Sequence, residues 1–174
     1  HSGHGMIKDA IETVVAGRDL TQAQAAEAMA EIMEGTATPA QFGAFVTALR
    51  LKGETPEEIA GMATVMREHS LHVNATGPLV DTCGTGGDAS GSFNISTTSA
   101  FVVAGAGVKV AKHGNRAMSS GSGSADVLEA LGAKIDLGPA SVQKCLAETG
   151  FGFMFAQRFH PSMKFAAGPR REIG

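Results

Sequence analysis

Apolar positions in the first 70 residues recur with the spacing of amphipathic helices, as at Ile7, Ile11 and Val14. Three further helix starts share a capping-box pattern, a threonine followed three residues later by Gln or Glu. These pairs are Thr21 with Gln24, Thr38 with Gln41, and Thr55 with Glu58. Gly35 and Gly53 stand where two of these helices should end. The pattern predicts four helices and an all-helical N-terminal domain over residues 6–75.

After Gly77 the pattern changes to short apolar runs that alternate with helical segments. Strands are expected at 78–82, 108–111, 134–137 and 151–155, and helices at 95–106, 125–131, 139–149 and from about Pro161. This alternation predicts the first part of an α/β domain with a mainly parallel sheet over residues 76–174. About four strands are fewer than the ~5–6 of an average sheet, so we expect the domain to be incomplete at its C-terminal end.

Composition narrows the function classes. The 174 residues are 43% hydrophobic and 18% charged, which suits a globular protein with a buried core. A net charge of -3 and the lack of Trp and Tyr do not favour nucleic-acid or membrane partners. The cysteines Cys83 and Cys145 form no C-x-x-C pair, and no apolar run reaches the length of a membrane span, so a cytoplasmic protein is expected. Residues 1–5 precede Met6, and we interpret them as a vector remnant.

The most informative motif is DTCGTGGD at residues 81–88, followed by NIST at 94–97. Glycines allow backbone N–H groups to approach an anion closely, and a helix start adds unpaired donors. A plain glycine-rich turn, with Asp88 and Asn94 acting only as caps, is the alternative. A single cap needs only one of the polar side chains in NIST, so their excess favours a phosphate ligand, and Ser96 is a candidate magnesium ligand.

Three further segments carry candidate binding groups. KHGNR at 112–116 follows an expected strand, so Lys112 and Arg116 can neutralise phosphate, and the alternative for this pair is a solvated surface. His113 fits packing or solvent exposure as well as ligand contact. The serine- and glycine-rich run at 119–124 fits either a linker or a second anion-binding loop with Ser124 as cap. His160 and Arg170 border the same site only if the chain folds back, and the alternative for Arg170 is an exposed charge on a helix.

The combination of motifs resembles the anthranilate phosphoribosyltransferase family. The resemblance rests on GTGGD at 84–88, NIST at 94–97, KHGNR at 112–116, SGSADVLEALG at 122–132, FMFAQRFHPSMK at 153–164 and RREIG at 170–174. It spans residues 6–174, and the helical N-terminal region is similar to the small domain of that family. It implies transfer of the 5-phosphoribosyl group from phosphoribosyl pyrophosphate to anthranilate in tryptophan biosynthesis, with Mg²⁺ and pyrophosphate release.

The resemblance also implies roles for individual residues. The residues implied to bind phosphoribosyl pyrophosphate are Gly84, Gly87, Asp88, Ser92, Asn94, Ile95, Ser96, Thr97, Lys112, Ser120 and Ser124. Those implied to bind or line the path of anthranilate are Gly84, His113, Asn115, His160 and Arg170, and Ser96 is the implied metal ligand. No general acid or base is identified, because an aromatic amine needs little activation.

The family's Asp–Glu pair for magnesium has no counterpart here, so we expect these 174 residues alone to be inactive. The expected partners are the two substrates and a second copy of the chain, bound through the helical domain. One alternative is an enzyme resembling pyrimidine nucleoside phosphorylase, in which a different lysine motif should replace KHGNR. The other is a non-catalytic relative that binds nucleic acid, which should have gained a basic face.

Overall fold

The computed structural model describes residues 6–84, 92–117 and 122–173. Their contacts divide the chain into two units, one formed by His1–Ser70 with His160–Gly174 and the other by Leu71–Phe159. The second segment of the first unit lies within the range 76–174 that the sequence pattern places in the α/β domain, so in this structure its contacts are with the helices that come before it in the chain. Ala166 is buried in the core of the helical unit, so packing rather than sequence order decides where this segment belongs.

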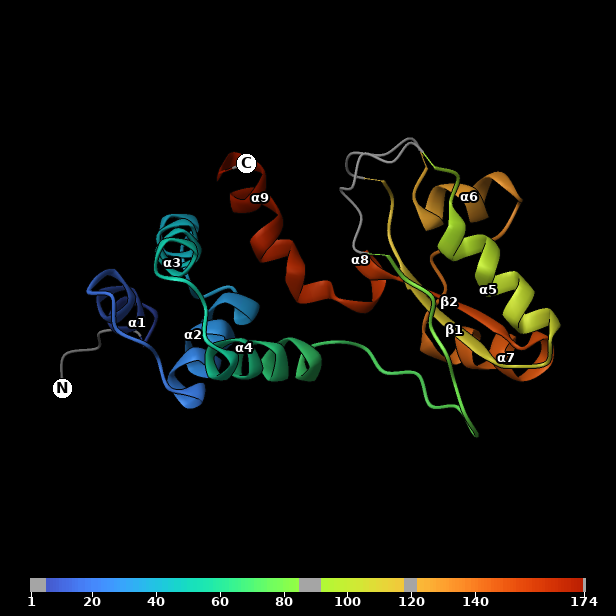
Figure 1. Ribbon diagram of the computed structural model, residues 1–174, viewed down its shortest axis with the longest axis horizontal. Helices are drawn as coiled ribbons and strands as arrows, with labels where there is room; N and C mark the ends of the chain where they lie inside the picture. Colours follow the sequence, from blue (N-terminus) through green and yellow to red (C-terminus); the bar gives the residue numbers. More distant parts are fainter. Residues whose placement is uncertain (1–5, 85–91, 118–121, 174) are drawn as a thin grey trace. The chain divides into compact units, whose positions relative to one another are not determined.

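The helical unit contains the four expected N-terminal helices (Figure 1). They are α1 (Met6–Val15), α2 (Gln22–Glu34), α3 (Pro39–Lys52) and α4 (Pro56–Glu68), joined by a short 3₁₀ turn (Pro161–Met163) and α9 (Lys164–Ile173). The three capping boxes at Thr21, Thr38 and Thr55 are all formed, which confirms the predicted starts. Gly35 ends α2 with a left-handed φ of 77°, a conformation that glycine adopts without strain.

Two close contacts hold α4 in the helical unit. At Gly61, a Cβ atom would lie only 2.2 Å from the carbonyl oxygen of Gln22, so the α2 and α4 backbones pack directly together. Glu58 is fully buried and accepts hydrogen bonds from the N–H groups of Leu20 (2.8 Å) and Thr55 (2.8 Å) and from the Lys52 ammonium (3.1 Å). One carboxylate therefore ties together the start of α4, the end of α3 and the segment before α2.

The second unit is a parallel α/β arrangement. Its elements are α5 (Ile95–Gly105), β1 (Val110–Gly114), α6 (Ser124–Ala130), α7 (Pro139–Thr149), β2 (Phe151–Phe155) and α8 (Ala156–Phe159). The strands β1 and β2 pair in parallel, with Val110 opposite Phe151 and Gly114 opposite Phe155. On the other side of β1, Val80 forms a parallel bridge with Val110. This confirms the expected fold class, a helical domain followed by a parallel α/β domain.

Helices cover both faces of this small sheet (Figure 1). Phe153 and Phe155 pack with Ala125 and Leu128 of α6 on one face, whereas Val142 and Leu146 of α7 pack with Ala111 on the other. Phe153 and Phe155 share one face of β2 because successive side chains of a strand point to opposite faces. None of the helices in the described residues is long and apolar enough to cross a membrane.

Several expected element bounds differ from the structure. Helix α7 and strand β2 have the predicted bounds, but β1 runs from 110 to 114 rather than from 108 to 111. Pairing with β2 extends β1 through its polar residues, which an apolar run cannot reveal. The expected strand at 78–82 is reduced to the single bridge at Val80, and the segment 134–137 forms no strand.

Candidate functional site

Three chain segments bring polar groups to the carboxyl edge of the sheet. They are the segment from Val80 to Thr82, the end of β1, and the end of β2, which run parallel and therefore finish at the same edge. In open α/β sheets, ligands bind beyond this edge. The start of the glycine motif and KHGNR are thus neighbours in space, and Lys112 to Gly114 lie within β1 rather than in a loop.

Lys112 lies at the centre of this edge and points inward. Its side chain is 1% exposed, and its ammonium donates to the carbonyl oxygen of Thr82 at 2.5 Å and to the hydroxyl of Ser96 at 3.4 Å. Burial lowers the pKa of Lys112 below its ordinary value, and the nearby Asp81 carboxylate partly opposes this effect. A buried ammonium therefore joins the end of one chain segment to the first turn of α5.

Asn94 is the N-cap of α5, and its implied contact with the phosphoribosyl donor stays a prediction. Its side-chain oxygen accepts from the Thr97 N–H (3.0 Å) and the Ser96 hydroxyl (3.2 Å), and its side-chain nitrogen donates to the Ser122 carbonyl (3.1 Å). Thr97 has a different status. Its hydroxyl is buried and has no hydrogen-bond partner among the described residues, which is costly unless a ligand or solvent supplies one.

Ser96 has the right chemistry for a hard cation. Its hydroxyl donates to Asn94 and accepts from Lys112, so one lone pair remains for a metal. Among the described residues, no group of three or more His, Cys, Asp or Glu side chains could hold a metal ion. Mg²⁺ commonly binds through one or two protein oxygens together with phosphate oxygens and water, so a single hydroxyl next to a diphosphate fits that ion.

The end of β1 lies directly against the start of α6. A Cβ atom on Gly114 would come within 2.8 Å of the Ser124 hydroxyl, so these two residues are in close contact. The Asn115 carbonyl accepts the Ala125 N–H at 3.2 Å. The structure thus brings Asn115 and Ser124 together, although Gly123 rather than Ser124 is the N-cap of α6.

Arg116 does not have the surroundings expected of a phosphate ligand. Its guanidinium forms a bidentate pair with Glu129 (2.6 and 2.9 Å) and a longer contact with Asp126 (3.4 Å). Hydrogen bonding to Arg116 lowers the pKa of Glu129, and the N–H groups of Ala117 and Gly123 lower the pKa of Asp126. Neither carboxylate is among the candidate residues read from the sequence, although their three-residue spacing places them on one side of a helix.

The other candidate residues have varied placements. Gly84, Ser92 and Ile95 are exposed, and Ile95 is the first residue of α5. The His113 N–H donates to Asp81 at 3.3 Å. His160 and Arg170 belong to the helical unit. The predictions for Gly87, Asp88 and Ser120 fall outside the described residues.

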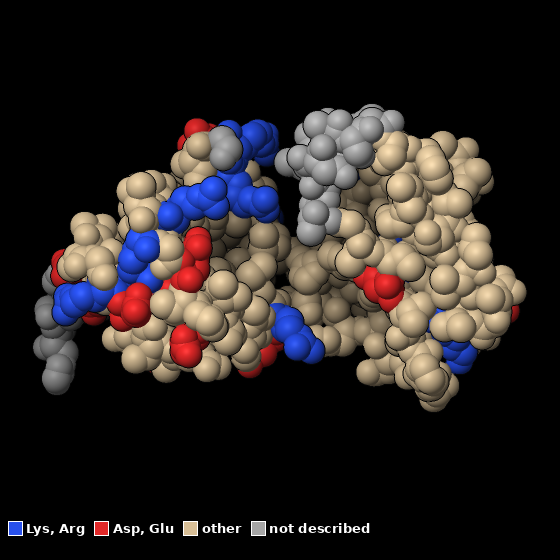
Figure 2. All heavy atoms as spheres, viewed as in Figure 1, with Lys and Arg blue, Asp and Glu red and all other residues tan. Residues whose placement is uncertain are grey.

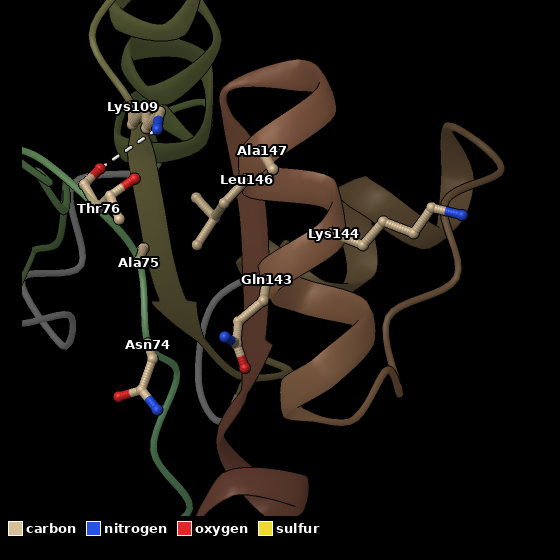
Figure 3. Close-up of a pocket in the computed structure, with 8 residues that line it drawn as sticks. All are labelled: Asn74, Ala75, Thr76, Lys109, Gln143, Lys144, Leu146 and Ala147. Carbon is tan, nitrogen blue, oxygen red and sulfur yellow. Dashed lines mark hydrogen bonds between the residues drawn. The ribbon is translucent and has the colours of Figure 1, made fainter.

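A cavity of about 500 Å³ lies elsewhere in the α/β unit (Figure 3). It is lined by Asn74, Ala75, Thr76, Lys109, Gln143, Lys144, Leu146 and Ala147. Lys109 precedes β1 and Ala147 lies near the end of α7, so this cavity is at the amino ends of the strands, opposite the candidate site. Lys109 donates to the Thr76 carbonyl (3.2 Å), while Lys144 points away from that pair, so the two cations do not converge on a ligand.

Family models match both parts of the chain. The model described as "Glycosyl transferase family, helical bundle domain" matches residues 8–70, and "Glycosyl transferase family, a/b domain" matches residues 76–174. The chain is 67% identical over 168 residues to the anthranilate phosphoribosyltransferase of Chloroflexus aurantiacus, which covers 97% of this chain and 50% of that protein. It is 62% identical to the Dehalococcoides mccartyi enzyme of the same name, and the match covers 97% of this chain and 50% of that protein. The chain therefore spans about half the length of the curated relatives it matches.

Solved structures show the same similarity. Anthranilate phosphoribosyltransferase from Thermus thermophilus matches with a TM-score of 0.87 at 46% identity, over 95% of this chain and 51% of that one. The Saccharomyces cerevisiae enzyme in complex with PRPP and Mg matches with a TM-score of 0.87 at 28% identity, over 98% of this chain and 53% of that one. A second structure of the yeast enzyme, in complex with 4-fluoroanthranilate, has a TM-score of 0.81 at 25% identity, over 98% of this chain and 51% of that one.

Proposed function

Because this chain belongs to the glycosyl transferase family, whose helical bundle and a/b domains it matches in order, we propose that the complete protein is an anthranilate phosphoribosyltransferase. It would transfer the 5-phosphoribosyl group of phosphoribosyl pyrophosphate to the amine of anthranilate, in tryptophan biosynthesis. The bond from the ribose C1 to the pyrophosphate oxygen breaks and a C1–N bond forms. Pyrophosphate leaves, and the amine releases one proton.

The observation that carries this proposal is the cluster of Lys112, Ser96 and Thr97 at the carboxyl edge of the sheet. Lys112 supplies a positive charge, Ser96 a lone pair and Thr97 a buried hydroxyl without a partner among the described residues. These are groups for holding a diphosphate and its metal, and such sites act mainly by positioning and by stabilising the charge that develops on the leaving group. The similarity to relatives of this name, and to a structure with PRPP and Mg, supports the same assignment.

Within this proposal, Mg²⁺ would offset the negative charge of the departing pyrophosphate, with Ser96 as the ligand from this chain. Asn94 would hold the first turn of α5 in place through its three hydrogen bonds. Lys112 would supply positive charge to the phosphate groups from its buried position. Gly84, Ser92, Ile95 and Ser124 would also contact phosphoribosyl pyrophosphate, as the resemblance implies.

The test is an assay of the complete protein with both substrates and Mg²⁺. We expect anthranilate to be consumed and pyrophosphate released in equal amounts, and both to depend on phosphoribosyl pyrophosphate and on the metal. Cleavage of a pyrimidine nucleoside by inorganic phosphate, without anthranilate consumption, would replace this function with the phosphorylase alternative. Calorimetric titration of phosphoribosyl pyrophosphate, with and without Mg²⁺, tests the donor site independently of turnover.

Arg170 is proposed to pair with the anthranilate carboxylate. It is an exposed arginine on α9, and a guanidinium recognises a carboxylate through two parallel hydrogen bonds. Arg170→Ala should raise the KM for anthranilate strongly and change the KM for phosphoribosyl pyrophosphate less. Arg171→Ala is the matched control, since it removes the same charge from the adjacent exposed position. An unchanged anthranilate KM in Arg170→Ala would exclude this role.

We further propose that the protein is a homodimer located in the cytoplasm. The helical unit exposes Val15 (70%), Leu51 (84%) and Ile59 (53%), and covering such side chains favours self-association. Both cysteines are free thiols, as is usual in a reducing compartment. In the view of Figure 2, Lys and Arg over the helical unit are interspersed with Asp and Glu, which gives no support to a nucleic-acid role.

A further inference from the structure

We propose that Arg116, Asp126 and Glu129 form a clamp that positions the Asn115–Ala117 turn at the carboxyl end of β1. The proposal rests on the proposed function, in which Asn115 binds anthranilate. Arg116 then acts through the turn that carries Asn115 rather than by contacting the diphosphate. This differs from the role that a basic residue in KHGNR suggests from its sequence alone.

Backbone hydrogen bonds attach this turn to α6. One oxygen of the Asp126 carboxylate accepts the N–H of Ala117 and the N–H of Gly123, both at 2.9 Å. The Asn115 carbonyl accepts the Ala125 N–H at 3.2 Å. Hydrogen bonds on both sides of Arg116 therefore hold the turn against the first residues of the helix.

Gly123 makes this close approach possible. A Cβ atom at position 123 would lie 2.3 Å from the Ala117 nitrogen and 2.7 Å from the Asn115 carbonyl oxygen, far inside normal contact distance. Both atoms are backbone atoms, so no side-chain rotation could relieve the overlap. The short distance from Asp126 to both N–H groups thus depends on a glycine at the start of α6.

The guanidinium of Arg116 is already engaged on several sides. It pairs with both oxygens of Glu129, reaches Asp126, and lies 5.8 Å from the ring centroid of Phe155, the last residue of β2. One positive charge faces two carboxylates, so the cluster as a whole carries no excess positive charge for a phosphate. An isolated exposed ion pair stabilises little, but a bidentate pair joined to backbone hydrogen bonds restricts geometry more strongly.

The two possible roles of Arg116 predict different kinetics. If Arg116 contacts the diphosphate, its loss raises the KM for phosphoribosyl pyrophosphate, and the loss of Glu129 leaves that KM unchanged or lowers it. If Arg116 belongs to the clamp, loss of either partner displaces Asn115 and affects anthranilate. A misplacement of about 1 Å can cost about a hundredfold, so a smaller displacement should cost roughly tenfold.

The experiment is a double-mutant cycle in the complete protein with Arg116→Gln, Glu129→Gln and both together. We expect each single variant to raise the anthranilate KM roughly tenfold, with a smaller change in the KM for phosphoribosyl pyrophosphate. The double variant should be no worse than either single variant, because both remove the same contact. Lys144→Gln is the control, as it breaks an exposed pair with Glu148 on α7.

Asp126→Asn and amide hydrogen exchange provide a readout without turnover. Protection of the Ala117 and Gly123 N–H groups should fall in this variant while the melting temperature stays close to that of the wild type. Unchanged protection, an additive double variant, or a specific rise in the phosphoribosyl pyrophosphate KM of Arg116→Gln would overturn the clamp. Absence of anthranilate turnover in the wild type would refute the proposed function instead, and the exchange measurement would still decide whether the clamp exists.

Discussion

Replacement of Glu58 by glutamine should destabilise the helical unit far more than the same change at an exposed capping-box residue. Glu58 is the third residue of α4, where a capping-box glutamate is normally exposed. Here its side chain is fully buried, and its two oxygens accept three hydrogen bonds from Leu20, Thr55 and Lys52. Glutamine has nearly the same shape but only one acceptor oxygen.

The expected loss follows from these three contacts. In either amide orientation, the new NH₂ group faces an N–H of Leu20 or of Thr55, so at least one buried donor loses its partner. A buried unsatisfied donor costs about 1–3 kcal/mol, and removing one charge from a buried pair costs about 3–5 kcal/mol. Lys52 keeps its pair with Asp19 at 2.7 Å, which reduces the second cost. We therefore expect a loss of about 3 kcal/mol in the free energy of unfolding.

Urea denaturation followed by circular dichroism measures this change, with Glu57→Gln as the matched control. Glu57 is exposed in the same turn of α4 and should change the free energy of unfolding by less than about 0.5 kcal/mol. At about 2–4 °C per kcal/mol, Glu58→Gln should lower the melting temperature by roughly 6–12 °C. A loss no larger than that of Glu57→Gln would refute the reasoning.

The difference in stability between the wild type and Glu58→Gln should also depend on pH. Burial alone would raise the pKa of Glu58, but the hydrogen bonds from Leu20, Thr55 and Lys52 outweigh it and lower the pKa below its ordinary value of 4.5. Since the folded pKa is depressed, the stabilisation is present above pH 4.5 and is lost as the pH falls through the folded pKa. The wild type and Glu58→Gln should therefore converge in stability in acid. A gap that stays constant below pH 4.5 would contradict the assigned ionisation.

Two further substitutions test packing and the site. Gly61→Ala should cost about 1–3 kcal/mol or more in urea denaturation, because its Cβ would overlap the Gln22 carbonyl. Gly43→Ala in α3, where the nearest atom lies 3.7 Å away, should be neutral or stabilising, and equal effects at both positions would contradict the packing explanation. Thr97→Val should weaken binding of phosphoribosyl pyrophosphate roughly tenfold in calorimetric titration while leaving stability nearly unchanged, since a hydrogen bond to a charged group contributes about 1.5–3 kcal/mol. Unchanged affinity would remove the Thr97 hydroxyl from the donor site.

Local sequence determined much of this protein. The capping boxes at Thr21, Thr38 and Thr55 and the bounds of α7 and β2 are as predicted. Each of these features depends on residues within about four positions of one another, so propensity and capping suffice. The alternation of elements after Gly77 likewise predicted the parallel arrangement, and in such a sheet the carboxyl ends of neighbouring strands lie at one edge.

Tertiary contacts decided how the residues of that edge are used. Lys112 meets Thr82 from 30 positions away, and Arg116 meets Glu129 across 13 positions. A basic side chain in a sequence carries no information about whether it faces a ligand, a carbonyl or a carboxylate, because that depends on what the fold places beside it. The burial of Lys112, the pairing of Arg116 and the packing of residues 160–174 with the helical unit thus became visible only in the folded chain.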